Sequence, residues 1–263
     1  MSLGVVIKGP EGVVLAADSR VTLQAQKGDG IPFPVNYDNA TKLFSFTEPH
    51  NFVGIVTYGL AALGLRTAHS FIPEFEVKLL YEDRYPIKKY AEILSDLFMS
   101  KWSESIPEDY QGPPMTFIVG GYDEDAPYGK VYMVAIPSNP SPVPRNVADN
   151  EFGMTWGGQL EFASRIINGF DPRLPSLIQQ KFELTNEQVG ELFTSIKGNL
   201  EYRIPYQVLP LQDCVDLATF MIQTTMIAQD LSVGVRGVGG PIDVATITRT
   251  QGIRFIKRKT IHV

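Results

Sequence analysis

Cysteine and histidine are scarce in this sequence of 263 residues. Cys214 is the single cysteine, so no disulfide can form within the chain and a cluster of cysteine ligands around a metal is excluded. His50, His69 and His262 are far apart and show no metal-ligand spacing, so the sequence predicts neither a metal ion nor a cofactor. A Ser-His-Asp triad has little histidine to draw on, and a hydrolase built on this chain needs a different base. Cys214 lies in an apolar stretch, which predicts a buried thiol rather than a nucleophile.

Long hydrophobic runs and an excess of basic residues are also missing. No uncharged apolar run reaches the length of about 18 residues that a membrane span needs, so we expect no membrane partner. The first residues lack the charged-then-apolar pattern of a signal peptide, and we expect a cytoplasmic protein. A formal net charge of −6 argues against a nucleic-acid partner, because phosphate binding leaves a basic footprint. The short basic run at Arg254, Lys257, Arg258 and Lys259 predicts a solvated final strand.

Turn-forming residues do not gather into one linker. The 23 glycines and 19 prolines are spread along the chain, and no tandem repeat or low-complexity tract is present. Hydrophobic residues make up 44% of the chain, which is enough for a substantial core. The sequence therefore predicts a single domain over residues 1–263.

A β-hairpin is predicted at the start of the chain. The β-branched runs from Leu3 to Ile7 and from Val13 to Ala17 are joined by the turn residues Gly9-Pro10-Glu11-Gly12. Pairing across this turn brings the chain start opposite Asp18 or Ser19, and the loop length decides which of them. Which face the side chains occupy stays open at this point.

The remaining pattern alternates between groups of strands and groups of helices. Residues 23–40 contain glycines, prolines and polar residues and predict a long loop. Further strands are predicted over residues 42–46, 52–57, 115–121, 130–136, 152–156, 242–248 and 253–257, and helices over residues 60–80, 86–97, 160–167, 186–202 and 211–231. Several strands are apolar on both faces, so the pattern favours two stacked sheets between helical layers.

The segment from Gly12 to Arg20, GVVLAADSR, resembles the signature of proteasome subunits and of their bacterial and archaeal relatives. Residues 41–43 are similar to the family's lysine segment, residues 54–59 to the glycine-rich strand end that follows it, and residues 239–247 to its glycine pair and strand near the C-terminus. On these motifs the chain is identified as a member of the proteasome β-subunit-like family of N-terminal-nucleophile (Ntn) hydrolases. The resemblance implies an α+β fold, a four-layer αββα sandwich of two antiparallel sheets between helical layers. The loop at residues 23–40 is longer than in a plain proteasome β subunit.

The resemblance also implies a catalytic set. In that family a threonine freed at the N-terminus attacks the substrate carbonyl, and an aspartate and a lysine stand behind it. Counting back from Asp18 places Ser2 at the nucleophile position, and Lys42 is the matching lysine. Since Ser2 is small, we expect methionine aminopeptidase to remove Met1 and leave Ser2 with a free α-amine. That amine, whose ordinary pKa is about 8, can act as the base without any histidine.

Supporting roles follow from the same resemblance. We expect Arg20 to brace Asp18, and the turn at Tyr58 and Gly59 to present backbone donors to the oxyanion. The family has glycine where Tyr58 stands, so a narrower pocket is predicted. The family's second serine is replaced by Gly157-Gly158. Its distal Asp and Ser are matched only approximately, by Asp230 and Ser232, with ordinary capping of a helix end as the alternative.

The function that the resemblance implies is a proteasome-type peptidase acting on peptides or unfolded proteins, assembled as a homo-oligomeric ring. An ATPase partner cannot be read from these residues. One alternative is a catalytically silent ring or scaffold subunit, which the change from threonine to serine and the missing second serine favour. Another is a ligase or transpeptidase, in which an amine rather than water accepts the acyl group.

Overall fold

The computed structural model describes residues 2–25, 28, 30, 33–79 and 83–260, so the predictions made for Met1 and His262 concern residues outside the described part. Its contacts divide the chain into two units. The first unit comprises Met1–Gly158 and Tyr206–Val263, and the second comprises Gln159–Pro205. The single domain over residues 1–263 stays a prediction.

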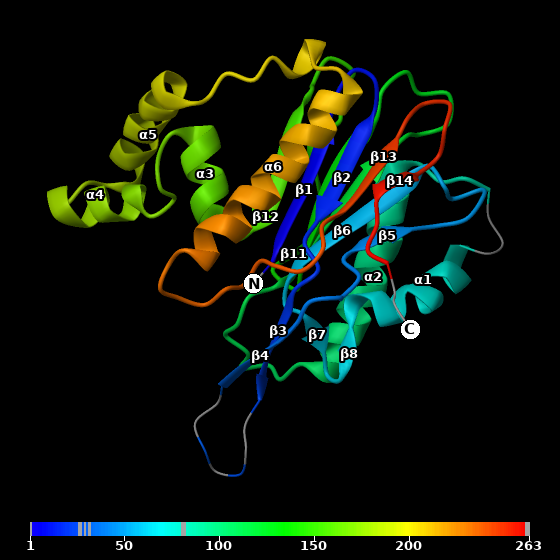
Figure 1. The fold of residues 1–263 in the computed structure, drawn as a ribbon, viewed down its shortest axis with the longest axis horizontal. Coiled ribbons are helices and arrows are strands. Elements are labelled where there is room, and N and C mark those ends of the chain that lie inside the picture. Colours follow the sequence, from blue (N-terminus) through cyan, green and yellow to red (C-terminus); the bar gives the residue numbers. More distant parts are fainter. Residues whose placement is uncertain (1, 26–27, 29, 31–32, 80–82, 261–263) are drawn as a thin grey trace. The chain divides into compact units, whose positions relative to one another are not determined.

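The first unit holds every β-strand of the described residues (Figure 1). The strands are β1 (Leu3–Lys8), β2 (Val13–Ala17), β3 (Val21–Ala25), β4 (Phe33–Tyr37), β5 (Leu43–Ser45), β6 (Val53–Gly59), β7 (Ala62–Leu63), β8 (Arg66–Thr67), β9 (Met115–Gly121), β10 (Lys130–Ile136), β11 (Asn139–Asn146), β12 (Gly153–Gly158), β13 (Asp243–Ile247) and β14 (Arg254–Lys257). Its helices are the short 3-10 turns η1 (Ala68–Phe71) and η2 (Tyr206–Val208) and the α-helices α1 (Ile72–Leu79), α2 (Ile87–Ser105) and α6 (Leu211–Asp230).

The hairpin predicted at the chain start is confirmed. Gly9 donates its N–H to the carbonyl of Gly12 at 2.9 Å, and the register places Gly4 opposite Ala17. One step further, Leu3 lies opposite Asp18, and the Asp18 N–H donates to the Leu3 carbonyl at 3.4 Å. This register fixes Ser2 and Asp18 at the same end of the hairpin.

Two five-stranded sheets carry the fold, and all their pairings are antiparallel. The strand order is β12-β1-β2-β13-β14 in the first sheet and β11-β10-β9-β6-β5 in the second. Every residue of β1, β2, β9 and β13 is buried, which explains why these strands are apolar on both faces. The α+β class with antiparallel sheets is therefore confirmed.

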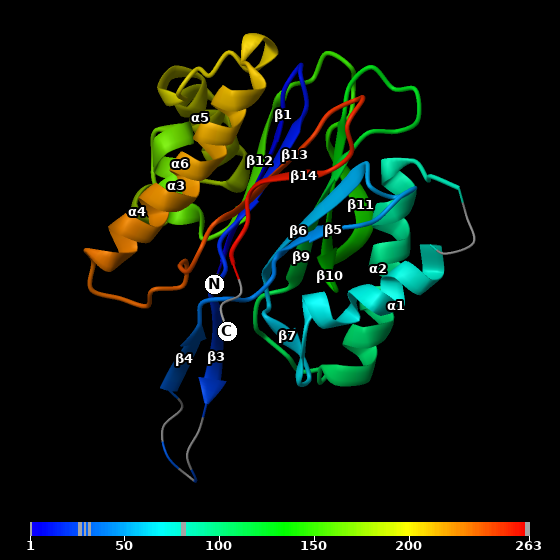
Figure 2. The same ribbon diagram turned by 45° about the vertical axis from the view of Figure 1, so that its right-hand side comes forward.

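The two sheets share one apolar core. Side chains of the first sheet, among them Val6 and Leu15, pack in one cluster with Val56 and Ile118 of the second sheet. Helix α2 packs across β9, β10 and β11, where a second cluster forms, and α6 packs on β1, β2 and β13 (Figures 1 and 2). The apolar stripes of these two helices therefore cover sheet faces that would otherwise be exposed.

Two predictions about elements are wrong, and two further elements were not predicted. Residues 23–40 are not one long loop, because β3 and β4 pair into a two-stranded ribbon. Residues 60–80 begin with the short strands β7 and β8, and helix α1 starts only at Ile72. Strand β11 was missed because its sequence NPSPVPRN is rich in proline, which an edge strand tolerates. Helix α4 was missed because Pro175 stands in its first turn and its side chains are not buried.

The second unit is helical. It contains α3 (Leu160–Asn168), α4 (Leu174–Phe182) and α5 (Asn186–Leu200). Helix α3 ends at Gly169, whose φ of +79° suits glycine. A capping box starts α5, in which Thr185 and Gln188 exchange side-chain and backbone hydrogen bonds.

The described residues can be compared with the expectations about membrane spans, metal ligands and the burial of Cys214. None of their helices is both long and apolar enough to cross a bilayer. They contain no group of three or more His, Cys, Asp or Glu side chains arranged to hold a metal ion. Cys214 is buried on α6, as predicted, and burial raises its thiol pKa to about 11.

Candidate active site at the end of the two sheets

The ends of three strands bring Ser2, Asp18 and Lys42 together. Ser2 directly precedes β1, Asp18 directly follows β2, and both strands belong to the first sheet. Lys42 directly precedes β5 of the second sheet, and the Thr57 N–H of β6 donates to the Lys42 carbonyl at 2.9 Å. The site thus lies at the end where the two sheets meet. Ser2 and Asp18 are 16 positions apart in the sequence and Asp18 and Lys42 are 24 apart, but the fold brings all three together.

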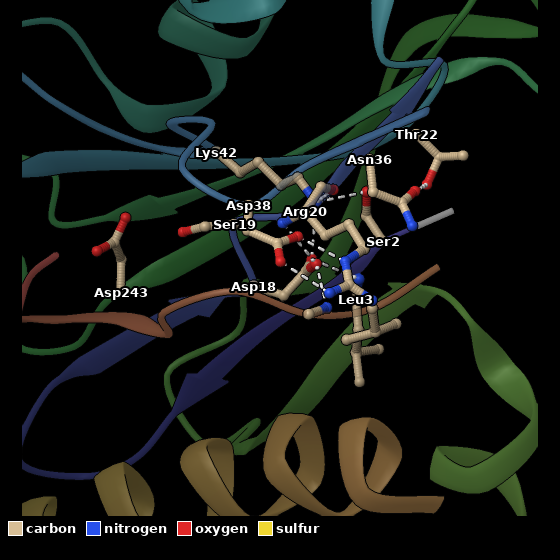
Figure 3. A network of polar contacts seen from close by, with 12 residues as sticks. Ser2, Leu3, Asp18, Ser19, Arg20, Thr22, Asn36, Asp38, Lys42 and Asp243 are labelled. Atoms are coloured by element: carbon tan, nitrogen blue, oxygen red, sulfur yellow. Dashed lines mark hydrogen bonds and ion pairs between the residues drawn. The ribbon is translucent and has the colours of Figure 1, made fainter. Parts of the chain in front are cut away.

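The Lys42 ammonium links the other two side chains (Figure 3). Its Nζ donates to Ser2 Oγ at 2.8 Å and to Asp18 Oδ1 at 2.8 Å. All three residues are buried, with relative exposures of 6% for Ser2, 1% for Asp18 and 4% for Lys42. A charged pair in such surroundings needs every charge to be hydrogen-bonded.

The Asp18 carboxylate accepts four hydrogen bonds. Oδ1 accepts from the Leu3 N–H at 3.0 Å and from Lys42, and Oδ2 accepts from the N–H groups of Arg20 and Gly239 at 3.1 Å each. Three of these donors are backbone groups from three separate segments. The carboxylate therefore fixes the end of β1, the turn after β2 and the segment before β13 around itself.

The Lys42 ammonium has three acceptors for its three N–H groups. Besides Ser2 Oγ and Asp18 Oδ1, it donates to the carbonyl of Arg20 in a short contact. Burial lowers the pKa of Lys42, Asp18 raises it, and the positive charges of Lys259 and Arg20 lower it. Because the ammonium donates to Ser2 Oγ, the hydroxyl proton of Ser2 must point elsewhere.

The Arg20 side chain pairs with Asp38 rather than with Asp18. Its Nε and one terminal nitrogen donate to the two carboxylate oxygens of Asp38 at 2.6 and 2.8 Å, and the other terminal nitrogen donates to the Arg236 carbonyl at 3.2 Å. The hydrogen bond from Arg20 lowers the pKa of Asp38, and the same bond raises the pKa of Arg20. Contact with Asp18 is made by the backbone N–H of Arg20, and contact with Lys42 by its carbonyl.

A second, largely buried ion pair lies beside the first. Lys259 donates from Nζ to Asp243 in a short contact and to Ser19 Oγ at 3.3 Å, and its N–H donates to the other Asp243 oxygen at 2.8 Å. The side chains of Lys259 and Asp243 are 11% and 4% exposed. The basic run at residues 254–259 was predicted to be solvated, and at Lys259 that prediction is wrong.

Tyr58 and Gly59 line a small cavity at Ser2. The cavity has a volume of about 20 Å³, and its other lining residues include Lys42 and Thr67. That volume holds about one water molecule. Burial raises the pKa of Tyr58 to about 12, and its hydroxyl donates to the sulfur of Met133 at 3.4 Å. Gly59 has a φ of +90°, and a Cβ there would lie 2.1 Å from the Pro114 carbonyl oxygen, so the turn requires glycine.

Gly158 holds the backbone of Ser2 at close range. A Cβ on Gly158 would lie 1.9 Å from the Ser2 carbonyl oxygen, and its φ of +104° is open to glycine but strained for other residues. Pairing of Leu3 with Gly158 across β1 and β12 produces this approach. The glycine pair thus positions the first residues of β1.

Asp230 and Ser232 lie at the end of α6, and their hydrogen bonds go to that helix end. Ser232 Oγ donates to the Gln229 carbonyl at 3.2 Å, and Asp230 pairs with Arg236 at 3.5 Å. Asp230 reaches the site only as a charge that helps to raise the pKa of Arg20. Instead, the buried Gln229 accepts from the Val238 N–H at 3.0 Å and so supports the segment whose Gly239 binds Asp18.

Sequence reasoning missed Asp38, Gln229, Asp243 and Lys259. Asp38 lies in the residues predicted as loop, and Gln229 lies in a helix where no periodic signal separates it from solvated neighbours. Asp243 begins a buried strand, which is an unusual place for a carboxylate and the one available signal for a paired cation.

The arrangement provides a hydroxyl in contact with a buried cation. An ammonium at hydrogen-bonding distance favours the ionised form of an oxygen, and Asp18 holds that ammonium in place. His50 is engaged elsewhere, with Tyr90 and the Leu79 carbonyl on its two ring nitrogens. A base for Ser2 therefore has to come from a group other than this histidine.

Comparison with known proteins gives structural relatives only. No family model matches the sequence, and no curated protein matches it. The chain is similar to the solved structure of a Gly-1 mutant of Anbu from Hyphomicrobium sp. strain MC1, with a TM-score of 0.58 and 13% identity, over 97% of this chain and 85% of that one. It is also similar to Anbu from Yersinia bercovieri, described as an ancestral beta-subunit, with a TM-score of 0.56 and 12% identity, over 98% and 88%.

These findings correct the family identification made from the GVVLAADSR segment. The two structures named above are Anbu proteins, and identities of 12–13% with no matching family model do not place the chain among the proteasome β subunits. What the likeness shows is the fold, which this chain shares with the two Anbu structures.

Proposed function

We propose that the chain is an Ntn amidohydrolase that cleaves peptide bonds, with Ser2 as nucleophile. The observation that carries the proposal is the 2.8 Å hydrogen bond from the buried Lys42 ammonium to Ser2 Oγ, backed by the Asp18 carboxylate. Hydrolysis of the bond between Met1 and Ser2 is part of the proposal, because it gives Ser2 a free α-amine. Residues 1–263 act as one domain with the four-layer αββα arrangement of such enzymes.

The proposed reaction has two halves. The Ser2 α-amine takes the hydroxyl proton, Oγ bonds to the substrate carbonyl carbon, and the tetrahedral intermediate expels the amine product, which leaves with that proton. A water molecule then attacks the ester, releases the acid and returns the proton to Oγ. Lys42 lowers the proton affinity of Oγ throughout, and the backbone at Tyr58 and Gly59 faces the developing oxyanion.

The proposal also covers the substrates and the assembly of the protein. The substrates are peptides or unfolded segments, because a buried nucleophile at a strand end accepts an extended chain. A homo-oligomeric ring in the cytoplasm is proposed by analogy with Ntn-type beta-subunits. Support for the ring comes from the fold alone.

Mutation of Ser2 tests the proposal. Wild-type protein, Ser2→Ala and Ser2→Thr are incubated with fluorogenic peptides and with a β-lactone, and intact mass reports both Met1 and the acyl adduct. We expect loss of turnover and of the adduct in Ser2→Ala and retention of both in Ser2→Thr. Ser19→Ala is the matched control, since Ser19 is also a buried serine in this network. Unchanged turnover or labelling in Ser2→Ala, or turnover by protein that keeps Met1, overturns the proposal.

A silent ring or scaffold subunit is the second candidate. The observation that favours it is the small size of the cavity at Ser2, about 20 Å³ with Tyr58 in its wall. Intact mass separates the two candidates, because retention of Met1 blocks the amine of Ser2. Retained Met1 together with a ring seen by negative-stain imaging supports the scaffold.

A further inference from the structure

The ribbon of β3 and β4 has one apolar and one polar face. Side chains alternate between the faces of a strand, so directly opposite residues share a face. The pairs on one face are Val21 with Tyr37, Leu23 with Val35, and Ala25 with Phe33, and Thr22 pairs with Asn36 on the other. An amphipathic ribbon of this kind has a face that calls for an apolar partner.

This apolar face is only partly covered by the rest of the chain. Leu23, Phe33 and Tyr37 are 39%, 47% and 58% exposed, and Figures 1 and 2 show the ribbon extending past the ends of the two large sheets. A two-stranded ribbon alone is marginally stable, and exposed apolar surface of this extent marks a binding surface.

The inner end of the face lines a cavity that adjoins Ser2. The cavity measures about 560 Å³ and is lined by Val21, Leu23, Asn36, Tyr37, Asp38, Asn39, Ala40 and Thr67. Val21, Ala40 and Thr67 also line the small cavity that contains Ser2 and Lys42. A substrate held at Ser2 can therefore extend one side chain directly into the larger cavity, whose volume lies within the range of about 300–1,000 Å³ typical of ligand sites.

Charge decides which side chain the cavity takes. Among the described residues that line it, Asp38 is the one with a charge, and both of its carboxylate oxygens accept hydrogen bonds from Arg20. That pairing neutralises the carboxylate and leaves no free anion for a lysine or arginine of the substrate. The amide oxygen of Asn36 is likewise engaged, by the hydroxyl of Thr22 at 2.8 Å. Apolar contact with Val21, Leu23 and Tyr37 remains.

We propose that this cavity binds a large apolar side chain, leucine or phenylalanine in kind, on the acyl side of the scissile bond, and that Leu23 and Tyr37 determine this specificity. The inference rests on the proposed attack by Ser2. It assigns the ribbon as the wall of the substrate site rather than as a surface loop.

Kinetics with matched peptides test the proposal. The substrates are N-acetyl-Ala-Ala-X-aminomethylcoumarin with X as Leu, Ala or Arg, and the variant is Leu23→Ser. We expect the wild type to prefer Leu, and the variant to lose about tenfold or more in kcat/KM for the Leu substrate, mainly through KM, with the Ala substrate little changed. Val35→Ser is the control, because Val35 is paired with Leu23 on the same face but does not line the cavity.

Binding measurements separate this inference from the catalytic proposal. Calorimetry on Ser2→Ala with N-acetyl-Ala-Ala-Leu-amide and N-acetyl-Ala-Ala-Ala-amide needs no turnover. Tighter binding of the Leu peptide that is lost in the Ser2→Ala, Leu23→Ser double variant supports the cavity even if the wild type hydrolyses nothing. Two results overturn the cavity assignment but not the role of Ser2 as nucleophile. One is hydrolysis of the Leu and Ala substrates with equal kcat/KM, and the other is an equal loss of kcat/KM in Leu23→Ser and Val35→Ser.

A second copy of the chain is the competing occupant of the face. Sedimentation of wild type, Leu23→Ser and Val35→Ser distinguishes it. If both variants dissociate an oligomer alike and neither alters peptide binding, the face is a subunit contact and the substrate proposal is wrong.

Discussion

The ring of Tyr58 occupies the space that a side chain on Gly157 would need. A Cβ on Gly157 would lie 2.1 Å from both Cζ and Oη of Tyr58. Gly157 lies on β12 of the first sheet and Tyr58 on β6 of the second, so the contact crosses between the sheets. The two residues are therefore coupled in volume: a large side chain on one strand requires none on the other.

This coupling predicts non-additive stabilities for a double variant. Gly157→Ser alone forces the serine against the Tyr58 ring, and we expect a loss of about 1–3 kcal/mol. Tyr58→Ala alone leaves a cavity and loses up to about 3 kcal/mol. In the double variant the serine fills part of that cavity, so its loss falls short of the sum by about 1 kcal/mol or more. Urea unfolding of the four proteins measures the coupling.

Gly190→Ser is the control for the glycine replacement itself. It lies on α5, and a Cβ there meets no atom within 4 Å. We expect little change in its unfolding free energy. Additive losses at Tyr58 and Gly157 contradict the volume coupling.

The sequence predicts the first hairpin and much of the sheet pattern because those strands are marked by buried β-branched runs. The turn Gly9-Pro10-Glu11-Gly12 sets the register that brings Ser2 to Asp18. Periodicity fails for β11 and for the β3–β4 ribbon, where prolines and glycines break the signal although the backbone still pairs. The pairing there is decided by the partner strand, which a local pattern does not contain.

The site could be predicted only in its first members. Ser2 and Asp18 border the two strands of the first hairpin, so their approach follows from its pairing, whereas Lys42, which precedes β5, was assigned to the site through the family resemblance. Asp38, Asp243 and Lys259 form ion pairs with residues far away in the sequence. The sequence around each of them does not indicate which residue is its partner. Arg20 was expected to brace Asp18; its N–H does bind Asp18, whereas its side chain pairs with both carboxylate oxygens of Asp38.

Asp18→Asn is predicted to destabilise the fold strongly. In one orientation the amide nitrogen of asparagine would face the N–H groups of Arg20 and Gly239. In the other it would face the Leu3 N–H and the Lys42 ammonium. In both cases two donors meet another donor, because an amide nitrogen accepts no hydrogen bond. We expect a loss of about 3–5 kcal/mol in the unfolding free energy, as when one partner of a buried pair is removed. Chemical denaturation measures it.

Asp38→Asn is the matched control for Asp18→Asn. Its ion pair with Arg20 is partly exposed, with the Asp38 side chain 44% exposed, so we expect a loss within about 1 kcal/mol. Comparable losses in the two variants would show that the four hydrogen bonds of Asp18 contribute little.

Gly158→Ala is predicted to move Ser2. Its Cβ would overlap the Ser2 carbonyl oxygen, and the φ of +104° adds backbone strain of about 1–3 kcal/mol. We expect lower stability and loss of labelling by a β-lactone. Gly198→Ala, on α5 with open space around it, is the control and should keep both. Full labelling of Gly158→Ala would mean that this close approach does not position the nucleophile.

Lys259→Gln is predicted to raise the pKa of Lys42. Burial lowers that pKa, and the positive charge of Lys259 lowers it further. Lys259→Gln removes that positive charge, and the buried Lys42 ammonium is then less disfavoured. The midpoint of the Lys42 titration therefore moves to higher pH. It is measured by following the chemical shift of the isotope-labelled Lys42 side chain during a pH titration. Lys259→Arg keeps the charge and should keep the wild-type pKa. If the Lys42 midpoint moves to lower pH in Lys259→Gln, or moves by the same amount in Lys259→Gln and Lys259→Arg, then Lys259 acts on Lys42 through packing and not through its charge.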